Sequence, residues 1–224
     1  MNRTEFIDKL SHKLGRPLPS QPPEMPQWQL PKFQLAGVAE RASLFLERWQ
    51  ALGGTGQRVD TIEEAAEALK TWFGPESQGL ISSQAIMAWT LPEFAEQTLA
   101  YLGWPLVRYA QIEGTAHTRA QAAAQAELGI TGTDWGIART GTLVLKSASG
   151  RGRAVSLLPP RHLAFLSVTT IVDDLIALIA ELKLQGHPPA AIELITGPSR
   201  TSDIEMDLSI GVHGPVQVYV LLTP

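Results

Sequence analysis

Apolar residues recur at helical spacing along much of the chain. Near the N-terminus, Phe6, Ile7, Leu10 and Leu14 fall on one stripe of residues 2–14. Apolar side chains three or four positions apart share one helical face, so this pattern predicts an amphipathic helix. Further helices are predicted at residues 35–52, 60–73, 92–102, 116–126 and 170–184. In the second of these, Asp60 followed by Glu63 matches a helix-capping arrangement.

Short apolar runs between these helices predict β-strands. The runs cover residues 79–82, 106–108, 130–139, 141–147, 154–158, 163–168, 192–196 and 216–222. Helices that alternate with short strands are typical of a parallel sheet covered by helices. The pattern therefore predicts an α/β fold built as a three-layer open sheet.

A proline-rich segment separates the first helix from the rest of the chain. Residues 15–31 contain six prolines, which prevent a helix and favour an extended linker. We therefore divide the chain into an N-terminal helical arm at residues 1–34 and an α/β domain at residues 35–224. The alternatives for the arm are a disordered leader and an ordered segment that packs on a second copy; the apolar stripe and Trp28 favour order.

Composition excludes several classes of protein. The 224 residues include no cysteine, which excludes disulfides and thiolate-bound clusters. A formal charge of −4 argues against bulk attraction to nucleic acid. No run of eighteen apolar residues predicts a membrane span, and Glu5, Asp8 and Lys9 do not fit a signal peptide. The expectation is a cytoplasmic protein.

Polar side chains gather between two Gly-Pro breaks near the C-terminus. After the run at residues 192–196 come Gly197, Ser199, Arg200, Thr201 and Ser202. Such a cluster at a strand end is typical of ligand sites in open α/β sheets, and backbone N–H groups in such a loop can hold an anion. The alternative is a surface turn.

A second candidate motif, Thr140-Gly141-Thr142, lies earlier in the sequence. It is either a second ligand contact or a tight turn between antiparallel strands.

The same C-terminal stretch contains the candidate acid and base groups. Asp203, Glu205 and His213 combine carboxylates with an imidazole, which suits proton transfer. Two carboxylates and a histidine also suit divalent metals, but no second histidine stands at ligand spacing, so we predict no metal site. The alternative for Asp203 is a structural role, in which its carboxylate caps a turn or helix.

His162 is expected to cap a strand. Residues 150–153 are expected to form a flexible basic loop, which is either solvated or holds an anion.

Three segments together resemble one family. They are residues 140–145 (TGTLVL), residues 156–160 (SLLPP) with His162, and residues 197–205 (GPSRTSDIE) with residues 211–215 (GVHGP). Their order and spacing resemble the LUD-domain family, and within it the lactate utilisation protein C subfamily. Residues 129–138 fit the same resemblance, which is strong over roughly the last hundred residues.

The resemblance implies a fold similar to the ribose-phosphate isomerase and CoA-transferase group. It also implies a role in oxidising L-lactate to pyruvate alongside iron–sulfur partner proteins. Family members commonly have glutamate where this chain has Arg139, and a cation cannot act as a carboxylate nucleophile or base. The alternative function is a stand-alone hydrolase, isomerase or transferase acting on a sugar phosphate or CoA ester.

These observations combine into one prediction about the site. Residues 140–142, 197–205 and 211–215 are expected to converge on a pocket for a small anionic ligand. Arg139 and Arg200 would add positive charge that favours a carboxylate or phosphate. Asp203 would orient the loop or His213, because a carboxylate repels an anion.

Overall fold

The computed structural model describes residues 2–15, 33–74, 86–186, 189–202, 208–210 and 214–224. The chain divides into two compact units, Met1–Lys32 and Phe33–Pro224. In the first unit, helix α1 (Arg3–Leu14) begins at a capping box in which Asn2 and Glu5 each accept the other's backbone N–H. This confirms the first predicted helix. Among the described residues, no helix is long and apolar enough to cross a membrane.

A six-stranded parallel sheet forms the centre of the second unit. Its strands, in spatial order, are β1 (Thr55–Arg58), β12 (Gln217–Thr223), β7 (Arg161–Ser167), β4 (Leu128–Gly132), β2 (Ile86–Ala88) and β3 (Val107–Arg108). Every pairing in it is parallel. The central strands β7, β4 and β12 are almost wholly buried, as expected for a sheet covered on both faces. The predicted α/β class is confirmed.

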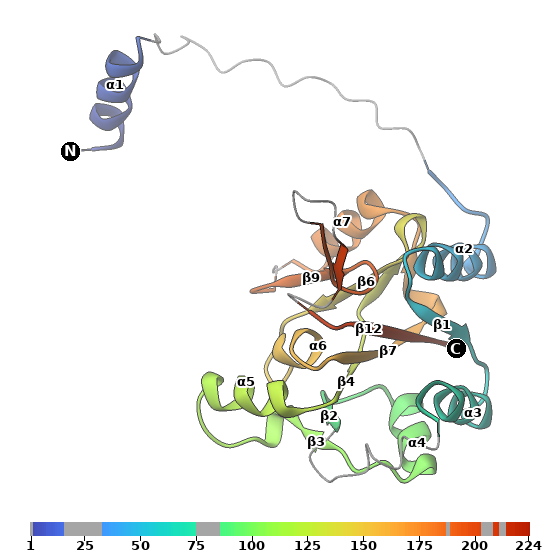
Figure 1. Ribbon diagram of the computed structural model, residues 1–224. Coiled ribbons are helices and arrows are strands. Elements are labelled where there is room, and N and C mark those ends of the chain that lie inside the picture. The colour runs from blue at the N-terminus through green and yellow to red at the C-terminus, as the bar shows by residue number, and fades with distance from the viewer. Residues whose placement is uncertain (1, 16–32, 75–85, 187–188, 203–207, 211–213) are drawn as a thin grey trace. The chain divides into compact units, whose positions relative to one another are not determined.

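Two helices cover one face of this sheet (Figure 1). They are α3 (Ile62–Phe73) and α4 (Glu93–Leu102), which pack Leu69 and Leu99 against Leu163 and Phe165 of β7. The N-cap of α3 is Thr61 rather than the predicted Asp60, because the Thr61 hydroxyl accepts the Glu64 N–H at 3.2 Å. The cap therefore lies one residue later than the sequence pattern indicated.

A second sheet, which the sequence pattern did not predict, lies over the other face. Its order is β8 (Ile171–Val172), β5 (Trp135–Ile137), β6 (Thr142–Lys146) and β9 (Ile192–Ile195). The β5–β6 and β6–β9 pairs are antiparallel, whereas β8 and β5 are parallel. A separate antiparallel hairpin joins β10 (Arg200–Ser202) to β11 (Leu208–Ile210).

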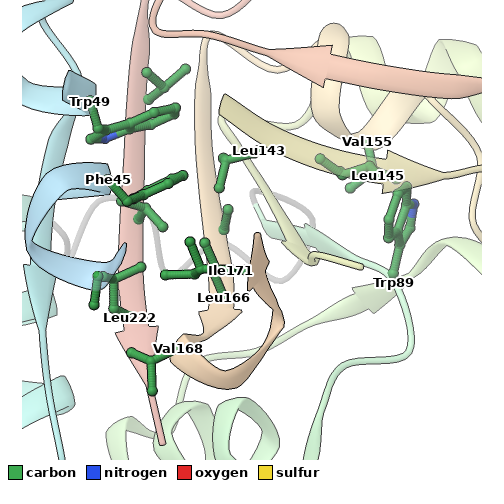
Figure 2. Close-up of a cluster of buried hydrophobic side chains, with 14 of the residues drawn as sticks. Phe45, Trp49, Trp89, Leu143, Leu145, Val155, Leu166, Val168, Ile171 and Leu222 are labelled. Atoms are coloured by element: carbon green, nitrogen blue, oxygen red, sulfur yellow. The ribbon is translucent and has the colours of Figure 1, made fainter. Parts of the chain in front are cut away.

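The largest apolar cluster fills the space between the two sheets (Figure 2). Leu143 and Leu145 of β6 meet Leu166 of β7 there, together with Phe45 and Trp49 of helix α2 (Val38–Ala51). Helices α5 (Ala116–Gln125) and α6 (Ala154–Leu157) contribute Ala123 and Val155. Short 3-10 turns at Tyr109–Gln111, Ala138–Thr140 and Val168–Thr170 follow strands β3, β5 and β7.

Helix α7 (Leu175–Leu184) covers part of the outer face of the four-stranded sheet. Asp174 caps it by accepting the N–H groups of Ile176 and Ala177 at 3.0 and 2.9 Å. The prediction of one helix over residues 170–184 is thus wrong at its start. Ile171 and Val172 form strand β8 instead, because the Asp174 cap fixes where the helix begins.

Two predicted strands also differ from the structure. The predicted strand at residues 154–158 is helix α6, whose N–H groups pair with carbonyls three and four residues earlier. Pro159 and Pro160 lack N–H donors and end it after one turn, too short for helical spacing to be visible. The run at residues 130–139 breaks after Gly132 into β4 and β5, which belong to different sheets. The predicted strand at residues 79–82 lies outside the described residues.

Candidate functional site

A row of three threonine hydroxyls marks the end of the four-stranded sheet. Thr142 begins β6 and Thr196 follows β9, so the antiparallel pairing brings these two residues opposite each other. Thr142 Oγ1 lies 2.9 Å from Thr196 Oγ1 and 2.7 Å from Thr140 Oγ1. Thr142 is 4% exposed, whereas Thr140 is open to solvent. Thr196 is also exposed, so the buried Thr142 hydroxyl links two exposed ones, and each hydroxyl can both donate and accept.

Two predicted site glycines pack against the C-terminal end of α2. Gly141 has φ +60°, and a Cβ there would lie 2.5 Å from the backbone nitrogen of Trp49. Gly197 has φ +88°, and its Cβ would lie 3.1 Å from the carbonyl oxygen of Leu52. Side chains rarely adopt these angles. Both glycines therefore let the chain turn closely against α2, which holds Thr142 and Thr196 in place.

The C-terminal motif divides between described and undescribed residues. The Ser199 N–H donates to the Pro215 carbonyl at 3.0 Å, so the two Gly-Pro breaks lie side by side. Arg200, Thr201 and Ser202 form β10, each paired in register with one residue of β11. The predicted acid and base groups Asp203, Glu205 and His213 lie outside the described residues. Strand β9, which leads into this motif, belongs to the mixed four-stranded sheet rather than to the parallel sheet.

Arg139 stands between two hollows beside the threonine row. Its guanidinium lies 5.1 Å from the ring centroid of Phe33, and its backbone N–H donates to Asp173 at 3.0 Å. One hollow, of about 580 Å³, runs along α2 and is lined by Phe33, Leu35, Glu40, Ser43, Leu44, Glu47, Arg48 and Arg139. The other, of about 300 Å³, is lined by Arg139, Thr140, Asp174, Leu175 and Ile176. A cation and a hydroxyl thus share the smaller hollow.

The acidic neighbours of this hollow are already engaged. Asp174 is 7% exposed and accepts two backbone N–H groups at the start of α7, where the helix dipole stabilises its charge. Asp173 lies 3.5 Å from the Arg41 guanidinium. For the Arg139 side chain, the described residues offer a ring contact but no carboxylate within ion-pair distance. Of the two charged side chains that line the smaller hollow, Asp174 is thus engaged by backbone N–H groups, and Arg139 has no carboxylate partner among the described residues.

A buried carboxyl lies on the opposite face of β9. The Glu193 side chain is 9% exposed, and its Oε2 lies 2.7 Å from the hydroxyl oxygen of Ser156. That hydroxyl also lies 3.0 Å from the Arg153 carbonyl, which is its second acceptor. Burial raises the pKa of Glu193, against weaker opposing effects of the Ser156 hydrogen bond and the Arg153 charge. Glu193 is thus a buried acid that accepts the Ser156 hydroxyl, with the Arg153 guanidinium 4.0 Å from its other carboxyl oxygen.

His162 is a core residue, not the strand cap that the sequence suggested. It lies within β7, is fully buried, and its Nε2 is 2.9 Å from Thr131 Oγ1 on the adjacent strand. Burial lowers its pKa to about 4, so the imidazole is neutral near pH 7. His162 lies within β7 because this strand begins at Arg161, two residues before the predicted strand at residues 163–168.

The predicted basic loop at residues 150–153 is held in place. Arg151 forms a two-point ion pair with Asp134, at 3.1 and 2.8 Å, and lies over the Trp89 ring at 4.7 Å. Its charge is thereby neutralised, so the expectation of a flexible loop that holds an anion does not apply to Arg151. Within the described part of the chain, no three histidine, aspartate or glutamate side chains gather as a metal site.

Comparison with known proteins gives the family. The family model described as LUD domain matches residues 42–223. The chain belongs to the LUD-domain family. Among its curated relatives, Lactate utilization protein C of Geobacillus sp. strain WCH70 is 33% identical over 99% of this chain and 96% of that protein. Lactate utilization protein C of Shouchella clausii is 31% identical over 96% of this chain and 95% of that protein.

A solved structure supports the fold of this LUD-domain chain. The crystal structure of a DUF162 family protein from Deinococcus radiodurans aligns with a TM-score of 0.58 over 85% of this chain and all of that one. The two chains are 20% identical, so this likeness concerns the fold alone. It independently supports the mixed α/β architecture.

Several residues of the site were missed by sequence reasoning. Thr196 was assigned only to the end of a predicted strand. Its place opposite Thr142 depends on the antiparallel pairing of β6 with β9, which the sequence did not predict. Asp174 directly precedes the apolar run of α7, which is a recognisable N-cap signal. Phe33 contacts Arg139 from more than a hundred residues away, and no local pattern could have indicated that pair.

Proposed function

We propose that this LUD-domain chain takes part in lactate utilisation. The support is that relatives named Lactate utilization protein C match it over almost their whole length, at 29–33% identity. The matched region contains the threonine row, Arg139 and the C-terminal motif. We further propose that the protein works in the cytoplasm.

The ligand proposed for the site is a small carboxylate such as lactate or pyruvate. The observation that carries this proposal is the threonine row beside the Arg139 guanidinium, which contacts no carboxylate among the described residues, at a hollow of about 300 Å³. That volume lies at the lower end of the roughly 300–1,000 Å³ found for small-molecule sites. A guanidinium binds a carboxylate with two parallel hydrogen bonds, and the exposed Thr140 hydroxyl supplies a further donor.

The remaining predicted residues complete this proposal. Gly197, Ser199, Arg200, Thr201 and Ser202 follow Thr196 in the sequence, and we propose that they complete the anion site beside the threonine row. Within the motif that continues from these residues, we propose Asp203, Glu205 and His213 as the groups that move protons. In this arrangement Arg139 is an anion-binding residue and takes no part in proton abstraction.

Electron transfer in such a system would need other proteins. Lactate oxidation to pyruvate releases two electrons, and the chain has no cysteine to hold an iron–sulfur cluster. We therefore propose that iron–sulfur subunits act as its partners and that this chain contributes the anion site.

Growth of the native host tests the function. Disruption of the gene should slow growth when L-lactate is the sole carbon source and leave growth on glucose unchanged, and the wild-type gene should restore it. If the disrupted strain grew on L-lactate as fast as the wild-type strain, that result would argue against a role in lactate utilisation. Restoration with Arg139→Ala then tests the site separately, because we expect that variant to restore growth poorly.

A further inference from the structure

The connections that follow strands β2 and β3 leave the parallel sheet on opposite faces (Figure 1). Strand β2 leads into α4, whose Leu99 packs in one cluster with Phe165 of β7. Strand β3 leads into α5, whose Ala123 packs in the other cluster with Ala164 of β7. Consecutive residues of a strand point to opposite faces. The carboxyl ends of the paired strands β2 and β3 therefore form a topological switch point, where open α/β sheets bind ligands.

A hollow of about 310 Å³ lies at this switch point. It is lined by Thr90 after β2, by Glu96 of α4, and by Arg108, Ala110 and Gln111 at the end of β3 and in the turn that follows. None of these residues lines either hollow beside the threonine row. Its volume lies at the lower end of the roughly 300–1,000 Å³ found for small-molecule sites. The hollow is therefore a separate candidate site.

An ion pair forms the polar wall of this hollow. Nη1 of Arg108 donates to Glu96 Oε1 and to the Trp89 carbonyl, each at 2.8 Å, and its Nη2 donates to Glu96 Oε2. Glu96 Oε1 also accepts the Leu91 N–H at 3.1 Å. These contacts leave two of the five guanidinium N–H groups for other partners. The Arg108 and Glu96 side chains are 24% and 35% exposed, so the pair is held in place and still open to a ligand.

The backbone behind the hollow is held on two sides. The Trp89 N–H donates to the Ile130 carbonyl at 3.2 Å, and its indole N–H donates to the Gly152 carbonyl at 3.0 Å. Gly150 has φ +75°, and a Cβ there would lie 3.0 Å from the Cβ of Ala110. The loop that contains these glycines thus packs closely against the turn after β3. Both sides of the hollow rest on fixed backbone, as in ligand sites that are largely preformed.

The charges of this hollow favour a neutral ligand. Arg108 and Glu96 are its two charged side chains, so the attraction of an anion to one is offset by repulsion from the other. The pair presents N–H donors beside carboxylate acceptors. The exposed Thr90 hydroxyl and Gln111 amide can each both donate and accept. Two adjacent hydroxyl groups match this wall, because each can donate to an acceptor and accept from a donor.

We propose that this hollow binds a vicinal diol, the two neighbouring hydroxyl groups of a sugar or of the ribose of a nucleoside. One hydroxyl donates to Glu96 and accepts from Arg108, and the other pairs with Thr90 or Gln111. The site does not depend on the role in lactate utilisation or on the anion proposed for Arg139, because the hollows share no lining residue.

NMR titration of the whole chain with neutral probes tests the ligand class. Adenosine has a vicinal diol, 2′-deoxyadenosine has lost one of its two hydroxyl groups, and methyl β-D-glucopyranoside has vicinal diols without a base. Adenosine or the glucoside should bind saturably, and 2′-deoxyadenosine should bind about tenfold more weakly than adenosine. Binding of adenosine without the glucoside assigns the site to a nucleoside, and binding of the glucoside assigns it to a free sugar. Equal binding of the two nucleosides, or no binding of either adenosine or the glucoside, would overturn the proposal.

Substitutions test the location of the binding. Thr90→Val and Gln111→Ala change exposed side chains, and each should weaken binding of the tighter probe about three- to tenfold. Gln57→Ala is the matched control, because it removes an exposed amide from β1 at the other edge of the same sheet, and it should bind like wild type. Urea denaturation verifies that each variant is folded. Folded Thr90→Val and Gln111→Ala variants that bind as tightly as Gln57→Ala would overturn the proposal.

Discussion

The six-stranded and four-stranded sheets differ in how their faces are covered. The parallel sheet has helices α3 and α4 on one face and the inter-sheet core on the other, and its central strands are almost wholly buried. The four-stranded sheet shares that core but leaves part of its outer face open, with the threonine row at one end and exposed Leu194 at the edge. One sheet therefore supplies stability, and the other supplies the surface on which the candidate site is built.

Truncating one apolar side chain in each sheet should show this contrast most strongly. Phe165 of β7 is 2% exposed, so Phe165→Ala should lower the free energy of unfolding by about 3–5 kcal/mol through lost burial and a cavity. Leu194→Ala on β9, at 50% exposure, should change it by about 0.5 kcal/mol or less. Urea denaturation measures both. Similar losses would show that the outer face of β9 is covered in solution.

Acid should destabilise the parallel sheet through His162. Its pKa is about 4 when folded and near 6.5 when unfolded, so the unfolded chain binds the proton first. Stability is then lost as the pH falls from 6.5 to 4, by about 3 kcal/mol at 1.36 kcal/mol per unit. Denaturation of wild type and His162→Gln across this range isolates the contribution. An equally steep acid loss in the variant would contradict it.

Glu193 in the four-stranded sheet should act in the opposite direction. Its folded pKa is raised by burial above the ordinary 4.5, so the folded state holds the proton longer. Stability from this group is present at low pH and is lost as the pH rises above 4.5. Glu193→Gln, whose amide oxygen can still accept the Ser156 hydroxyl, should therefore be more favourable relative to wild type at pH 7 than at pH 4. A pH-independent difference in unfolding free energy would show that folding leaves the pKa of Glu193 unchanged.

The sequence predicted strands of both sheets, although β1 and β2 of the parallel sheet were missed, and it did not predict that the strands form two sheets. Strands β7 and β12 are long and apolar, so their burial pattern is visible locally. The second sheet depends on contacts that no local pattern contains: β8 is two residues long, and β5 follows β4 after a short break. Thr140 and Thr142 were identified from their motif, but their link to Thr196 required the antiparallel register of β6 and β9. The predictions for Asp203, Glu205 and His213 lie outside the described residues.

Binding of pyruvate and L-lactate to Thr142→Val tests the central claim most directly. Thr142 joins the other two hydroxyls, and valine has nearly the same shape, so the loss of unfolding free energy should stay near 1 kcal/mol. By isothermal titration calorimetry, wild type should bind at least one of the two anions, and Thr142→Val should bind it roughly tenfold more weakly. Binding of equal strength by the folded variant, or no binding of either anion by wild type, would contradict the proposed site.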